Sequence, residues 1–162
     1  MFIGSLKYCQ KNKGMIIHAL CLMTNHEHLI FSCKEKGKHS DILRDLKKFT
    51  SKKIIESILD NPFESRKEWI IEILSDAGIN NSNNKEYPFW QQDNHPIEIY
   101  SPSVISQKLS YLHNNPVESG IVSEAEHYLS SSAFSYCGQI GLIELEILDV
   151  PASRVGYIYT GR

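Results

Sequence analysis

Two apolar runs separated by a short turn constrain the fold of this chain more than any other feature. Residues 15–23 are rich in β-branched and apolar side chains, and residues 26–33 form a second run of this kind. Thr24 and Asn25, which stand between the two runs, favour a tight turn. Short apolar runs joined in this way are typical of a β-hairpin. The sequence therefore predicts two antiparallel strands at 15–23 and 26–33.

The second of these runs opens with two histidines, His26 and His28. Side chains two positions apart on a strand point to the same face of the sheet, so both imidazoles can be directed at one point. Two neutral imidazoles held on a rigid strand supply half of a divalent-metal site. A pair of polar residues on an exposed strand face is the alternative interpretation.

Helical periodicity and turn signals predict further elements on both sides of the hairpin. Ser40 or Asp41 would cap the long helix that follows it, and Pro116 would end the last helix. The order of helix, hairpin, long helix, strand and helix predicts an α+β domain, with a ferredoxin-like antiparallel sheet covered by helices. Helices are expected at 2–13, 41–59, 64–77 and 102–115, short strands at 87–92 and 142–150, and no regular pattern at 151–162.

Basic residues are concentrated in one segment of a chain whose overall charge is slightly negative. The 162 residues carry a formal net charge of −2, yet eight basic residues stand against three acidic ones between Lys34 and Lys53. Such a local excess is a candidate phosphate-binding face, and a solvated helix face is the competing interpretation. The residues singled out for contact with DNA backbone are Arg44, Lys47, Lys48, Lys52 and Lys53.

The cysteines and the hydropathy of the chain bear on its compartment. The four cysteines show no C-x-x-C pairing, which favours reduced thiols over a disulfide framework or a zinc ribbon. No apolar stretch approaches the roughly 20 residues that span a bilayer, and no signal peptide opens the chain. We therefore expect a cytoplasmic protein that does not bind membranes.

A second segment with reactive groups lies in the predicted helix at 102–115. Tyr111 and Asn115 are four positions apart, which places them on one helix face a turn apart. Asn115 can offer an amide oxygen to a cation, and Tyr111 a phenolic oxygen beside it. Tyrosine becomes a useful nucleophile when a base accepts its proton and a metal polarises the electrophile. Alternatively, Tyr111 is a core aromatic and Asn115 caps the helix.

Three sequence blocks, at 23–28, 90–96 and 111–122, resemble in this order the signatures of the REP-associated tyrosine transposases. These enzymes are single-tyrosine members of the HUH nuclease class, and the resemblance extends from about residue 5 to residue 135. It implies a transposase domain over 1–135 that is incomplete at its N-terminus, followed by a tail at 136–162 with one further strand. The implied fold is the same ferredoxin-like one.

The resemblance also implies a mechanism and a set of site residues. Mg²⁺ or Mn²⁺ would be held by His26, His28 and Asn115, and Tyr111 would be the nucleophile. The substrate would be single-stranded or hairpin DNA, which is cleaved and rejoined through a 5′-phosphotyrosine intermediate. Trp90 could stack on unpaired bases, or else belong to the core. A homodimer is left open.

Two features depart from the family pattern. Glu27 stands between the two histidines, where the family prefers an apolar residue, and a buried carboxylate is costly unless it is paired. The family also has a strand before its first helix, whereas this chain opens at Met1 inside that helix. The absence of that strand would leave unpaired backbone beside the histidine strand and put activity in question.

Two other functions are compatible with the same residues. One is a non-catalytic nucleic-acid-binding module, in which the histidines are structural. The other is a metal-dependent hydrolase that uses the histidines together with a carboxylate, Asp93 or Glu98, and water as its nucleophile.

Overall fold

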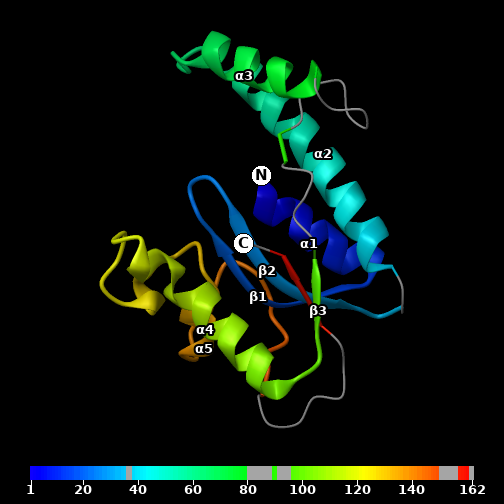
Figure 1. Ribbon diagram of the computed structural model, residues 1–162, viewed down its shortest axis with the longest axis vertical. Coiled ribbons are helices and arrows are strands. Elements are labelled where there is room, and N and C mark those ends of the chain that lie inside the picture. Colours follow the sequence, from blue (N-terminus) through cyan, green and yellow to red (C-terminus); the bar gives the residue numbers. More distant parts are fainter. Residues whose placement is uncertain (36–37, 80–88, 91–95, 150–156, 161–162) are drawn as a thin grey trace.

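The structure is a computed structural model that describes residues 1–35, 38–79, 89–90, 96–149 and 157–160 (Figure 1). It is an α+β domain with a four-stranded antiparallel sheet, which confirms the predicted fold class. The helices are α1 (Phe2–Lys13), α2 (His39–Asp60), α3 (Lys67–Ile79), α4 (Pro102–Glu118) and α5 (Ala133–Tyr136), and the strands are β1 (Met15–Leu22), β2 (Glu27–Cys33), β3 (Ile97–Ile99) and β4 (Tyr157–Thr160).

The predicted hairpin is formed by β1 and β2. The two strands pair in antiparallel register from Met15 opposite Cys33 to Leu22 opposite Glu27. The Met23 amide donates a hydrogen bond of 2.9 Å to the His26 carbonyl and closes the turn. Alternation along β2 directs its side chains to opposite faces of the sheet, and each face is covered by a helical layer.

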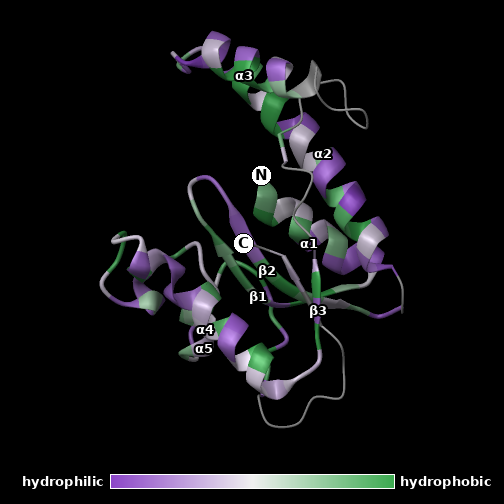
Figure 2. Cartoon of the chain, in the orientation of Figure 1, coloured by the Kyte–Doolittle hydropathy of each residue, from purple (hydrophilic) through white to green (hydrophobic). Residues whose placement is uncertain are grey.

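Two hydrophobic clusters lie on opposite faces of the sheet. Leu29 and Phe31 of β2 pack with residues of α1 and α2 on one face, whereas Ile30 packs with residues of α4 on the other. Figure 2 shows hydrophobic and hydrophilic residues alternating along α2, as expected for a helix with one buried side. Helix α3 lies beyond the end of α2, away from the sheet (Figure 1).

Strand β4 lies between β2 and β3, since the strand order is β1-β2-β4-β3. It pairs antiparallel with both neighbours, and Tyr159 stands opposite Ile30 of β2 and Ile97 of β3. The expectation that the histidine strand would have an unpaired edge is therefore wrong, because β4 occupies the position beside it. The expectation of no regular pattern after Pro151 is also corrected by this strand.

The strand predicted at 142–150 is not formed over the described residues up to 149. This segment instead passes around the edge of the sheet, with Ile143 buried in the cluster on one face and Leu148 in the cluster on the other. The Glu146 amide donates to the Ile17 carbonyl at 2.9 Å. The register of β1 shifts just after Ile17, around His18, which interrupts regular pairing along this edge.

Several element boundaries differ from the prediction. Helix α2 begins at His39 with Lys38 as its N-cap and has no side-chain cap bond, so the predicted cap at Ser40 or Asp41 is wrong. Helix α3 covers Lys67–Ile79 rather than 64–77. The strand predicted at 87–92 falls outside the described residues except for 89 and 90, which form none.

Helix α4 continues through Pro116 to Glu118, so Pro116 does not end it as predicted. Proline lacks an amide hydrogen and normally disrupts a helix interior. Here Pro116 is buried, and only two residues follow it within the helix. Its carbonyl accepts a hydrogen bond of 2.9 Å from the Ile121 amide, which extends the chain reversal after the helix.

The remaining expectations concern thiols and membranes. All four cysteines are free, as the absence of paired spacing predicted. Over the described residues, no helix combines the length and the apolar character that crossing a membrane requires.

Candidate metal and nucleophile site

His26 and His28 lie on the same side of the sheet at the start of β2, where their ring centroids are 4.9 Å apart. His26 precedes the strand and is exposed, and its Nδ1 lies 2.7 Å from the Asn25 side-chain oxygen. His28 is inside the strand and only 1% exposed. The pair therefore consists of one imidazole at the surface and one beneath it.

Burial also determines the charge of His28. Desolvation, and then the nearby His26 and Lys108, lower the pKa of His28 to about 4. The imidazole is consequently neutral at pH 7, which is the form that can ligate a metal.

Asn115 of α4 also contacts His28, because α4 packs on the face of the sheet that carries the His28 side chain. Its Nδ2 lies 3.1 Å from Nε2 of His28, and the residue is buried. Its Oδ1 is also buried, and it has no hydrogen-bond partner among the described residues. A buried oxygen without a partner is costly, and a cation beside it would remove that cost. Two imidazole nitrogens and this oxygen fit a divalent metal.

Tyr111 lies one turn before Asn115 on α4 and meets His28 edge-on, with ring centroids 5.4 Å apart. It is 37% exposed, so its ring borders the site without being enclosed by it. The spacing that predicted a shared helix face for Tyr111 and Asn115 thus brings both residues to the same histidine.

The sequence analysis missed Tyr159 on β4. Its hydroxyl lies 2.8 Å from Nδ1 of His28, and its ring stacks against the imidazole with centroids 5.9 Å apart and planes 10° apart. The Lys108 ammonium lies 4.8 Å from the centroid of the Tyr159 ring. Aromatic and β-branched residues alternate in Tyr157-Ile158-Tyr159-Thr160, a pattern typical of a strand that could have predicted β4. The pattern does not indicate that β4 pairs with β2.

Residues 2–70, which span α1, the histidine hairpin and α2, match the family described as "Transposase IS200 like". The match supports a member of the single-tyrosine transposase family. No curated protein and no solved structure matches it. The matched residues include His26 and His28, whereas Tyr111, Asn115 and Tyr159 lie beyond them.

Glu27 points to the face of the sheet opposite His28, as alternation along β2 requires. It is buried, and burial raises the pKa of its carboxyl to about 7. The Thr160 hydroxyl donates to Oε2 of Glu27 at 3.2 Å, and the charge of Lys47 opposes the rise in pKa. The carboxyl group that departs from the family pattern is thus hydrogen-bonded by Thr160, but burial still favours its protonated form.

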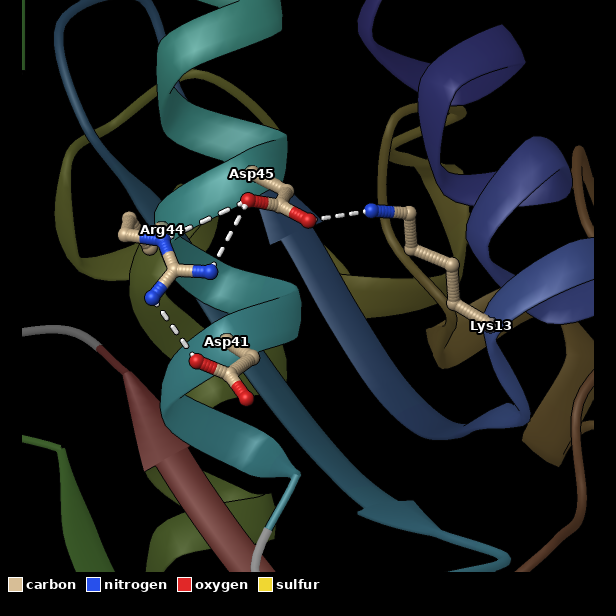
Figure 3. Close-up of polar contacts among 4 residues, drawn as sticks. All are labelled: Lys13, Asp41, Arg44 and Asp45. Carbon is tan, nitrogen blue, oxygen red and sulfur yellow. Dashed lines mark hydrogen bonds and ion pairs between the residues drawn. The ribbon is translucent and has the colours of Figure 1, made fainter.

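The basic residues singled out for DNA contact are on α2, across the sheet from the histidines. Arg44 is engaged by Asp41 at 2.8 Å and by Asp45 at 3.4 Å, and Lys13 of α1 also binds Asp45 (Figure 3). Lys52 and Lys53 pair with Glu56. Lys47 is half-buried near Glu27, and Lys48 is exposed. The segment is a helical surface, much of whose charge is already paired within the chain.

The third sequence block is only partly described. The indole of Trp90 donates a hydrogen bond of 2.9 Å to the Thr50 hydroxyl of α2, and its ring lies 5.6 Å from that of Phe2. Trp90 is thus half-buried and attached to α2 and α1. Asp93 and its neighbours at 91–95 lie outside the described residues.

The second carboxylate considered for a hydrolase, Glu98, is on the exposed side of β3 and bonds the Tyr100 hydroxyl. Over the described part of the chain, no cluster of three or more His, Cys, Asp or Glu residues could hold a metal. Glu98 therefore does not complete a site with the two histidines, whereas Asn115 is in direct contact with His28.

Proposed function

We propose that this protein is a metal-dependent, single-stranded DNA transposase that cleaves and rejoins DNA through a 5′-phosphotyrosine intermediate. The observation that carries the proposal is the contact between Asn115 and His28, 3.1 Å long, which brings the predicted ligands of two distant segments together. Tyr111, one turn away on the same helix, borders the same imidazole. The match of residues 2–70 to a transposase family agrees with this chemistry.

The proposed ligands for Mg²⁺ or Mn²⁺ are His26, His28 and Asn115. Neutral imidazoles and a buried amide oxygen without a partner form a donor set of the right kind. When bound, the cation would polarise the scissile phosphate and neutralise charge that develops on its oxygens.

Tyr111 is proposed as the nucleophile. Its phenolic oxygen forms a bond to phosphorus while the bond from phosphorus to the 3′ oxygen breaks. The phenolic proton is lost to solvent, and the departing 3′ oxygen gains one to become a hydroxyl. The protein is then joined to the 5′ phosphate of the downstream strand, and attack by another 3′-hydroxyl reverses the step. No nucleotide cofactor is needed, because the phosphotyrosine bond retains the energy for rejoining.

The proposed DNA partner is single-stranded or hairpin DNA, bound in part by the basic surface of α2. Of its residues, Lys48, Lys52 and Lys53 are exposed and can reach phosphates, since surface ion pairs such as those with Glu56 are weak and exchangeable. Arg44 pairs with Asp41 and Asp45, and Lys47 is half-buried near the Glu27 carboxyl.

The test is denaturing electrophoresis after incubation with Mn²⁺ and a pool of hairpin oligonucleotides of randomised sequence. We expect a label at the 3′ end of the DNA to migrate with the protein, and a label at the 5′ end to be released on a shorter fragment. Tyr111→Phe should abolish both signals, whereas Tyr100→Phe, at an exposed tyrosine of the same chain, should keep them. Cleavage without an adduct would support a hydrolase, and binding without cleavage would support a non-catalytic module.

A further inference from the structure

His28 has a hydrogen-bond partner on each of its two ring nitrogens. Nε2 faces the Asn115 amide at 3.1 Å, and Nδ1 faces the Tyr159 hydroxyl at 2.8 Å. A neutral imidazole carries one N–H and one lone pair, so its two partners together determine which nitrogen is protonated. Only the nitrogen with the lone pair can ligate a metal.

The contact with Asn115 determines which ring nitrogen of His28 carries the lone pair. The group of Asn115 that faces Nε2 is the NH₂, which can only donate. With the amide in this orientation, Nε2 is the acceptor and the proton resides on Nδ1. The Tyr159 oxygen is then the acceptor for the Nδ1–H group, a role that carbonyls and carboxylates commonly play behind metal-binding histidines.

Strand β4 holds the histidine motif from both faces of the sheet. Tyr159 contacts His28 on one face, and the next residue, Thr160, donates to Glu27 on the other. Two consecutive residues of β4 thus bind two consecutive residues of β2. The backbone register that places Tyr159 opposite Ile30 fixes this arrangement, so the His28 ring can hardly rotate without breaking a strand contact.

We propose that Tyr159 is a positioning residue that keeps His28 in the Nδ1–H tautomer and thereby presents Nε2 for metal binding beside Asn115. The effect of Tyr159 on metal binding rests on the proposed function, whereas the tautomer of His28 can be measured in the metal-free protein. Tyr159 is not a second nucleophile, because it is 1% exposed and enclosed between Lys108 and His28, whereas Tyr111 is 37% exposed.

The experiment measures the nitrogen chemical shifts of His28 by long-range ¹⁵N–¹H correlation on the metal-free protein at pH 7. The chain has seven histidines, and the signals of His28 are identified by their loss in His28→Gln. Tyr159→Phe removes only the hydroxyl and keeps the stacked ring. The matched control is Tyr136→Phe, which also removes a part-buried hydroxyl, one that bonds the backbone of His18 and Leu148 and does not touch His28.

We expect a protonated Nδ1 and an unprotonated Nε2 in the unmodified protein and in Tyr136→Phe. In Tyr159→Phe the Nε2–H tautomer should increase, and Mn²⁺ affinity measured by calorimetry should fall by roughly 10- to 100-fold. A protonated Nε2 in the unmodified protein would overturn the proposal, and this measurement does not depend on Tyr159→Phe folding.

The remaining outcomes separate the two proposals. If the unmodified protein binds Mn²⁺ and Tyr159→Phe binds it equally well, or with an unchanged tautomer, the role of Tyr159 is refuted while the metal site stands. If the unmodified protein does not bind Mn²⁺, the proposed function fails, and the tautomer measurement still decides whether Tyr159 positions His28.

Discussion

The side-chain nitrogen of Asn115 lies 3.1 Å from Nε2 of His28, although 87 positions separate the two residues in the sequence. Helix α4 achieves this approach by packing on the sheet through residues such as Leu112, which is fully buried. The buried side of the helix therefore also fixes where its polar residues meet the histidine strand. The following predictions depend on this packing.

Replacing Asn115 should weaken metal binding in a way that depends on the oxygen atom. Asn115→Ala removes the buried amide oxygen, so we expect Mn²⁺ affinity measured by calorimetry to fall at least about tenfold. Asn115→Asp retains an oxygen and adds a negative charge, so it should bind Mn²⁺ at least as well as the unmodified protein. Asn114→Ala, at the exposed neighbouring position, is the control. Equal affinity in Asn115→Ala and Asn114→Ala would exclude Asn115 as a ligand.

Removing exposed lysines from α2 should reduce the salt dependence of DNA binding. The triple variant Lys48→Ala, Lys52→Ala and Lys53→Ala should bind single-stranded DNA more weakly, with a slope of log K against log salt smaller by about 0.7 for each phosphate that is no longer neutralised. The measurement is fluorescence anisotropy over a series of salt concentrations. A control variant with Lys7→Ala and Lys11→Ala, at exposed lysines of α1 outside the basic segment, should keep the original slope. Equal slopes in the two variants would leave the α2 lysines as a solvated surface.

Truncating Leu112 should destabilise the protein and disturb the site. The side chain is fully buried in the cluster beneath α4, so Leu112→Ala should lower the free energy of unfolding by about 2–5 kcal/mol. Leu129→Ala, at a leucine that is 71% exposed, should change it by less than about 0.5 kcal/mol. Urea denaturation followed by circular dichroism measures both. A small effect at Leu112 would contradict the packing of α4 described above.

His18 should make stability fall as the pH is lowered. Burial lowers the pKa of His18 in the folded state, and its ring nitrogens contact the Glu146 carbonyl and the Ser32 hydroxyl at 2.8 Å. The unfolded chain binds the proton more readily, so the contribution of His18 is complete above the ordinary histidine pKa near 6.5 and is lost as pH falls below it.

The measurement for His18 is the melting temperature from pH 8 to pH 5. In His18→Gln the melting temperature should decline less steeply over this range than in the unmodified protein. His127→Gln, at an exposed histidine, should follow the unmodified profile. Parallel profiles for the unmodified protein and His18→Gln would show that His18 does not account for the decline.

The elements that the sequence predicted well are those with a local signature. The hairpin at 15–33 follows from two apolar runs and a turn, and the shared helix face of Tyr111 and Asn115 follows from their spacing. Neither depends on knowing what lies next to it in the folded chain. The placement of His26 and His28 on one face has the same origin.

What the sequence did not predict depends on distant partners. Strand β4 is four residues long, too short for a pattern to establish, and its neighbour β2 lies well over a hundred positions earlier. The role of Tyr159 follows only from that pairing. Likewise, the number of basic residues gave no indication that Asp41 and Asp45 already bind Arg44.

The position of β4 in the middle of the sheet has a consequence for biosynthesis. A ribosome completes the hairpin and α4 long before it reaches residues 157–160, and the Tyr159–His28 contact joins positions 131 residues apart. Until residues 157–160 emerge from the ribosome, the edge of β2 that pairs with β4 lacks this neighbouring strand. Pairings between strands so far apart in the sequence form slowly. The histidine site is therefore among the last parts of the domain to be assembled, so a nascent chain would carry its histidines well before they are held in place.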